Sequence, residues 1–118
     1  MVSNEIDVLI KKVSTKNIIT KSIKNNAFTI LLKNINHCTD IINYIAPEHL
    51  HLHVSSYKKL LSKINNAGGI FLGEYSVEAF GDYIAGTNHI LPTLGSAKFS
   101  SGLGVLDFMK RNSIVEIN

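Results

Sequence analysis

Residues 47–72 read PEHLHLHVSSYKKLLSKINNAGGIFL and contain two strand patterns on either side of one helix pattern. Over residues 49–54, histidine alternates with leucine or valine, a period of two that is typical of a half-buried strand. Residues 57–64 carry apolar side chains at helical spacing, and the apolar run at residues 70–72 predicts a second strand. Strand, helix and strand in this order favour a parallel pair, so the stretch predicts an α/β fold.

The sequence before this stretch continues the alternation of helix and strand patterns. The predicted elements there are a helix at residues 5–13, a second helix between Thr15 and Asn25, a strand at residues 28–32 and a helix at residues 38–45. Pro47 ends the last of these helices, because a proline excludes the residue before it from the helical region. We therefore predict one α/β domain over residues 1–118, with helices flanking a mostly parallel sheet in three layers.

The segment from Gly73 onward has a different character, because glycines recur where a helix or strand would not tolerate them. Ser76 is predicted to cap a short helix, and Gly81 and Gly86 are predicted to break that helix into an irregular loop. Long irregular segments in small domains usually carry function. The sequence thus predicts a glycine-rich catalytic loop region after the α/β layer.

The composition is that of a globular protein: of 118 residues, 45% are hydrophobic and 18% are charged. The net charge of +3 comes from scattered lysines, whereas nucleic-acid binders concentrate basic residues on one face. We therefore expect no nucleic-acid partner. Cys38 is the single cysteine, which excludes an intrachain disulfide. No secretory signal or membrane-length apolar run is present, so we expect a cytoplasmic protein that does not contact a membrane.

Glu48 and His49 are the first candidates for catalysis. They lie where a helix stops and a strand starts, which puts them at the edge of the sheet. Histidine accepts a proton readily near neutral pH, and the neighbouring carboxylate can act on a second proton or on a water. The alternative is structural: Glu48 is a solvated loop acid and His49 opens an amphipathic strand.

Two other sets of residues are of the kinds that bind metals. His49, His51 and His53 share one strand face, but that pattern is also typical of an exposed edge strand, which we favour for the last two. Asp82 and His89 lie seven residues apart across a glycine-broken loop, where an aspartate can ligate a metal and a histidine can support it. The alternative is a turn stabilised by the Asp82 side chain and a histidine packed under the loop.

Five strings of this sequence, in this order, resemble the histidinol dehydrogenase family. They are Pro47–Leu50 (PEHL), residues 67–73 (AGGIFLG), 78–83 (EAFGDY), 86–93 (GTNHILPT) and 100–103 (SSGL). The resemblance implies the C-terminal half of an enzyme that oxidises L-histidinol to L-histidine with NAD and zinc, and a partial Rossmann-like domain. It implies that His49 is the general base and that Glu48 activates water. It further implies that Asp82 ligates zinc, that His49 and Asp82 contact the substrate, and that His89 has a supportive role.

The departures from the family pattern suggest that the chain is truncated. In the family, the carboxylate that Asp82 matches shares the zinc with a glutamine and two histidines that have no counterpart here, and no residue of the NAD site is matched. We therefore expect a chain that lacks the N-terminal part and the last segment of the enzyme and that is inactive alone. Its expected partner is a separate N-terminal half or a second copy in a homodimer. The alternatives are a small α/β binding or interaction module, and a half-enzyme subunit that complements a separately encoded part. A truncated chain also predicts uncovered apolar side chains at Phe80, Leu91, Leu103 and Phe108.

Overall fold

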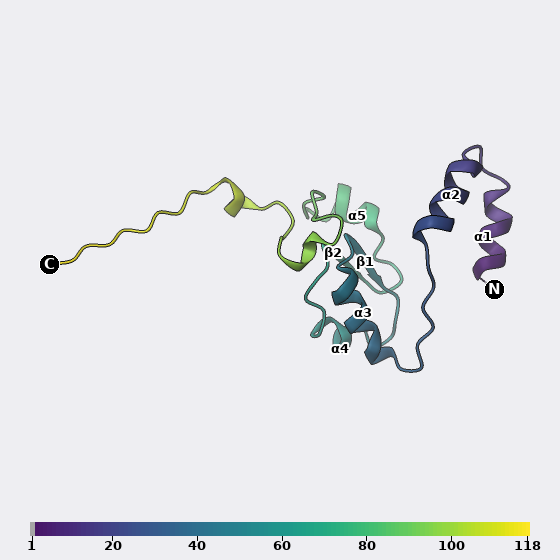
Figure 1. Cartoon of the computed structure of the whole chain (residues 1–118), viewed down its shortest axis with the longest axis horizontal. Coiled ribbons are helices and arrows are strands. Elements are labelled where there is room, and N and C mark those ends of the chain that lie inside the picture. The colour runs from purple at the N-terminus through teal and green to yellow at the C-terminus, as the bar shows by residue number, and fades with distance from the viewer. Residues whose placement is uncertain (1) are drawn as a thin grey trace. The chain divides into compact units, whose positions relative to one another are not determined.

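The computed structural model describes residues 2–118 of the chain, in which contacts define two compact units, Met1–Lys33 and Asn34–Asn118 (Figure 1). The first unit contains the two helices that the apolar spacing predicts, α1 (Val2–Ile10) and α2 (Lys16–Asn26). Neither helix contains a buried residue, and the apolar residues Ile6, Ile10, Ile19 and Ile23 are only partly buried.

The second unit carries the predicted strand–helix–strand stretch. It contains α3 (Cys38–Ile45), β1 (His49–Leu52), α4 (Tyr57–Leu61), β2 (Gly69–Leu72) and α5 (Glu78–Tyr83), with 3-10 turns η1 (Ile35–His37), η2 (Ser96–Lys98) and η3 (Val105–Phe108). The two strands pair in parallel, with His49 opposite Gly69 and Leu52 opposite Leu72. The mixture of helices with a parallel sheet confirms the predicted α/β class.

The core of this unit lies on one face of the sheet, which α3 and α4 cover (Figure 1). Leu52, Leu60 and Ile64 are buried there. The half-buried side chains packed around them are Cys38, Ile42, Leu50, Val54, Tyr57, Ala67, Ile70 and Leu72. Because side chains alternate along a strand, His49, His51 and Phe71 point to the opposite face, on the side of α5.

The end of α3 sets the direction in which the chain enters β1. Ala46 adopts the left-handed conformation with φ 53°, and its backbone N–H donates to the Ile42 carbonyl at 2.8 Å. Pro47 follows directly, as the sequence predicts. Glu48 therefore lies directly before β1, and His49 is the first residue of this strand.

Asn43 ties α3 to the turn that precedes β2. Its Oδ1 accepts the backbone N–H groups of Asn65 at 2.8 Å and Asn66 at 3.1 Å, and its Nδ2 donates to the Lys63 carbonyl at 2.9 Å. One side chain thus satisfies three backbone groups of a turn that has no ladder of its own. This clamp fixes the start of β2 beside the start of β1.

Three local predictions are wrong. Residues 28–32 have no regular secondary structure and pair with no strand among the described residues, because strand-like composition does not itself supply a hydrogen-bonding partner. Ser76 does not cap α5: its Oγ donates to the Leu72 carbonyl at 2.6 Å, and Val77 holds the capping position. Gly81 lies inside α5 instead of breaking it, because a Cβ there would approach the Phe71 ring to 3.1 Å and the bare backbone lets the helix pack closely.

Candidate active site

The backbone around Glu48 is fixed by two hydrogen bonds from the glycine turn before β2. Gly68 N–H donates to the Pro47 carbonyl at 2.9 Å, and Gly69 N–H donates to the Glu48 carbonyl at 2.7 Å. These bonds extend the pairing of the strands to the residues just before β1. Glu48 and His49 consequently lie at the amino end of β1, whereas sites in open α/β sheets usually lie at the carboxyl ends of strands.

Three groups surround the imidazole of His49. Glu48 Oε1 lies 3.8 Å from Nδ1, and Glu78 Oε1, from the first residue of α5, lies 3.3 Å from Nε2. The Phe71 ring stacks on the imidazole, with ring centroids 6.0 Å apart and planes inclined by 27°. The His49 side chain is 26% exposed, so it is held on three sides and remains accessible to a ligand.

Gly68 should be intolerant of any side chain. A Cβ at this position would lie 2.5 Å from the Glu48 carbonyl oxygen, and backbone atoms cannot move away as a flexible side chain can. We expect Gly68→Ala to lower the free energy of unfolding by about 1–3 kcal/mol through this overpacking. The measurement is urea unfolding of the full chain followed by circular dichroism.

Gly104→Ala is the matched control for Gly68→Ala. Gly104 has extended backbone, and the nearest atom to its added Cβ would be Asp107 Oδ2 at 3.8 Å, an ordinary contact. Equal unfolding midpoints for the two variants would contradict the expected clash.

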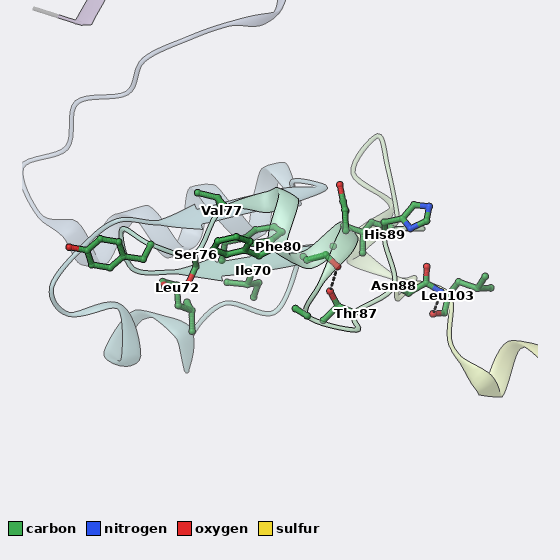
Figure 2. A pocket seen from close by; sticks show the side chains of 18 residues that line it. Ile70, Leu72, Ser76, Val77, Phe80, Thr87, Asn88, His89 and Leu103 are labelled. Atoms are coloured by element: carbon green, nitrogen blue, oxygen red, sulfur yellow. Dashed lines mark hydrogen bonds between the residues drawn. The ribbon is translucent and has the colours of Figure 1, made fainter.

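A pocket of about 820 Å³ lies between β2, α5 and the glycine-rich loop (Figure 2). In Figure 2, Ile70 and Phe80 form its apolar middle, and Thr87, Asn88 and His89 gather at one end. Asp82 and His89 both line this pocket, so the structure brings the two loop candidates to one cavity. Glu48 and His49 do not line the pocket. His49 nevertheless stacks on Phe71, which is one of the lining residues.

Polar side chains hold the loop that forms this end of the pocket. Thr87 Oγ1 donates to the Gly81 carbonyl at 3.0 Å, and Asn88 Nδ2 donates to the Leu103 carbonyl at 3.0 Å (Figure 2). Asn88 Oδ1 also accepts the backbone N–H of Ile90 at 2.8 Å. Asn88 therefore links its own segment of the loop to the segment that contains Leu103, so this residue has a structural role.

Asp82 does not complete a metal site with the groups around it. The described part of the chain contains no cluster of three or more His, Cys, Asp or Glu side chains placed to hold a metal ion. His51 instead stacks on Phe71 with centroids 4.8 Å apart, and His53 meets the edge of His51 at 5.7 Å. Zinc sites in proteins use three or four protein ligands, so these residues do not fit a zinc ion without further donors.

Apolar side chains around the site are incompletely covered. Phe80 is 51% exposed and Phe108 is 80% exposed, as expected, whereas Leu91 and Leu103 are half-buried. Leu91 approaches the start of β2, where a Cβ on Gly69 would lie 3.1 Å from its Cδ1.

None of the helices in residues 2–118 combines the length and apolarity needed to cross a membrane.

Glu78 is the neighbour of His49 that the sequence pattern did not reveal. It precedes Asp82 by one turn of α5, whereas His49 lies on a different element far back in the chain. No local periodicity links two such positions. The approach comes from the packing of α5 against Phe71, where Gly81 has no side chain.

The comparisons with known proteins agree on one family. The sequence model of histidinol dehydrogenase matches residues 1–118. The histidinol dehydrogenase of Hydrogenovibrio crunogenus is 50% identical over 107 residues, which cover 91% of this chain and 25% of that protein. The histidinol dehydrogenase of Neisseria gonorrhoeae is 45% identical over 113 residues, which cover 96% of this chain and 26% of that protein.

A solved structure shows the same likeness. The crystal structure of histidinol dehydrogenase from Elizabethkingia anophelis superimposes with a TM-score of 0.73 at 36% identity, over 83% of this chain and 22% of that one. The fold and the sequence thus define a chain of the α/β type found in these dehydrogenases. The chain belongs to the histidinol dehydrogenase family and spans about a quarter of the length of the curated relatives it matches.

Proposed function

We propose that this chain contributes the proton-transfer residues of an enzyme that oxidises L-histidinol to L-histidine. Its relatives carry the name histidinol dehydrogenase over nearly the whole of this chain. The observation that carries the proposal is the position of His49, whose two ring nitrogens face Glu48 and Glu78 while its ring remains partly exposed. An imidazole placed between carboxylates is suited to accept a proton from an alcohol near neutral pH.

The two acid–base residues have separate roles in this proposal. Oxidation of the alcohol to the aldehyde removes a proton from oxygen and a hydride from carbon, and His49 accepts the proton. Oxidation of the aldehyde to the acid first requires water to add to the aldehyde carbon, and Glu48 takes a proton from that water. The hydride removed at each stage would pass to NAD, which protein segments other than this chain would hold. The adjacent positions of Glu48 and His49 let both groups act at one carbon.

Asp82 is proposed as one zinc ligand that also contacts the substrate, and His89 as a supporting residue. Both line the same pocket, and Asp82 projects from α5, the helix that also carries Glu78. Because the described residues do not fit a zinc ion alone, we propose that the remaining zinc ligands come from other protein segments, either of a longer enzyme or of a second copy. We propose the same origin for the NAD site. We accordingly expect no turnover by this chain alone.

The finer features of the fold and the location also stay proposals. A three-layer, Rossmann-like sheet is compatible with the parallel pair β1–β2, to which further strands of the complete enzyme would add. The single α/β domain over residues 1–118 and the cytoplasmic location stay predictions from the sequence. The absence of nucleic-acid and membrane partners stays a prediction as well.

A chimera tests the function directly. In it, this chain replaces the matching residues of the Hydrogenovibrio crunogenus enzyme, over the 107 residues that align. We expect the chimera to form NADH from L-histidinol in the presence of zinc, and we expect the chain alone to form none. An Asp82→Ala version should retain less zinc on dialysis while keeping its fold. A folded chimera without activity would contradict the proposal and favour a binding or interaction module.

A further inference from the structure

Two carboxylates approach His49 from opposite sides, and they are not equivalent. Glu78 Oε1 lies 3.3 Å from Nε2, close to the hydrogen-bonding range, whereas Glu48 Oε1 lies 3.8 Å from Nδ1, outside that range. Glu48 is the sequence neighbour of His49 and shares its strand end. Glu78 reaches the imidazole from a separate helix, so its contact depends on how α5 packs.

The packing of α5 on the sheet places Glu78 beside His49. Phe71 stacks on the His49 ring, and its ring edge faces the bare backbone of Gly81, where a Cβ would lie 3.1 Å from Phe71 Cε1. The missing side chain at Gly81 lets α5 approach Phe71 closely. The first residue of α5 therefore comes within reach of the imidazole, although 29 residues separate Glu78 from His49 in the sequence.

The proton on a neutral imidazole resides on the nitrogen that has the better acceptor, and the other nitrogen keeps its lone pair. We infer that Glu78 is the positioning residue of His49: it accepts the Nε2–H and leaves Nδ1, on the side of Glu48, as the proton acceptor. The inference rests on the proposed role of His49 as the base. Carboxylates that fix the tautomer and the orientation of a functional histidine act in this way in other sites.

Nuclear magnetic resonance of the full chain tests the inference without any enzyme activity. The ¹⁵N shifts of the two His49 ring nitrogens report which one carries the proton, and cross-peaks between the His49 and Phe71 rings report the orientation. In Glu78→Ala we expect the two nitrogen shifts to move towards each other and the ring cross-peaks to weaken. Glu78→Asp, which keeps the charge on a shorter side chain, should restore part of both signals.

Glu74→Ala is the matched control, since Glu74 is an exposed carboxylate on the segment that leads into α5. It should leave the His49 signals unchanged. His49 ring-nitrogen shifts that are the same in Glu78→Ala as in the unmodified chain would overturn the inference, whether or not the chimera is active.

Kinetics of the chimera separate this inference from the proposed function. With Glu78→Ala we expect kcat to fall by about tenfold to a hundredfold, by analogy with the loss when the carboxylate partner of a metal-ligating histidine is removed, while KM changes little. An inactive chimera with Glu78 in place would refute the proposed function and leave the spectroscopic test to decide the positioning. An active chimera whose kcat is unaffected by Glu78→Ala would refute the positioning alone.

Discussion

Replacing His49 by asparagine in the chimera is expected to lower kcat for NADH formation by about 10²–10⁴-fold, the contribution of a general base. Asparagine has a similar size and keeps polar atoms near the ring nitrogens, but it does not accept a proton near neutral pH. The neighbouring Phe71 and Glu78 keep their places, so the loss should fall on the chemical step. Initial rates at saturating L-histidinol and NAD measure the effect.

His53→Asn is the appropriate control for this variant. His53 continues the strand face of His49 but is exposed, and its ring contact is to His51. The control should retain the rate of the unmodified chimera. If the His49 variant retained most of its activity as well, another group would be the base and the central assignment would be wrong.

The second large effect concerns stability. Leu60, on α4, is 1% exposed and lies at the centre of the core with Leu52 and Ile64. We expect Leu60→Ala to lower the free energy of unfolding by about 2–5 kcal/mol, because truncation loses apolar burial and leaves a cavity. Urea unfolding of the full chain, with the slope of the transition compared between variants, measures the change.

Leu94→Ala makes the same chemical change at a position with no packing to lose. The Leu94 side chain is fully exposed, at 104% of its reference area, and its positive φ of 52° is equally unfavourable for leucine and alanine. We expect its unfolding midpoint to match that of the unmodified chain. A Leu60→Ala midpoint as high as that of Leu94→Ala would show that α4 does not anchor this core.

The sequence was sufficient to predict the elements that depend on local periodicity. The alternation at residues 49–52 and the apolar spacing at residues 57–61 correspond to β1 and α4, and the crossover through α4 allows the strands to pair in parallel. Residues 28–32 show the limit of this reasoning. Their composition is that of a strand, but a strand exists only through a hydrogen-bonding partner, and periodicity does not name one.

The sequence predicted some residues of the candidate site but not the contact between Glu78 and His49. Glu48 and His49 are adjacent in sequence and stay together by necessity, and a loop held by Asn88 brings Asp82 and His89 to one pocket. The approach of Glu78 to His49 depends on the packing of α5 against Phe71, which no spacing in the sequence encodes.

The parallel pairing of β1 and β2 also makes the second unit dependent on contacts between distant positions of its sequence. Each residue of β1 pairs with the residue twenty positions later, so the strands meet only after the intervening chain has turned back on itself. Closing a loop of that length costs about 2.7 kcal/mol of chain entropy by the logarithmic scaling of loop closure. Since α4 lies within the loop, its helical turn shortens the path to be closed. Strand pairing is therefore a non-local step, and His49 should reach Phe71 and Glu78 late in folding.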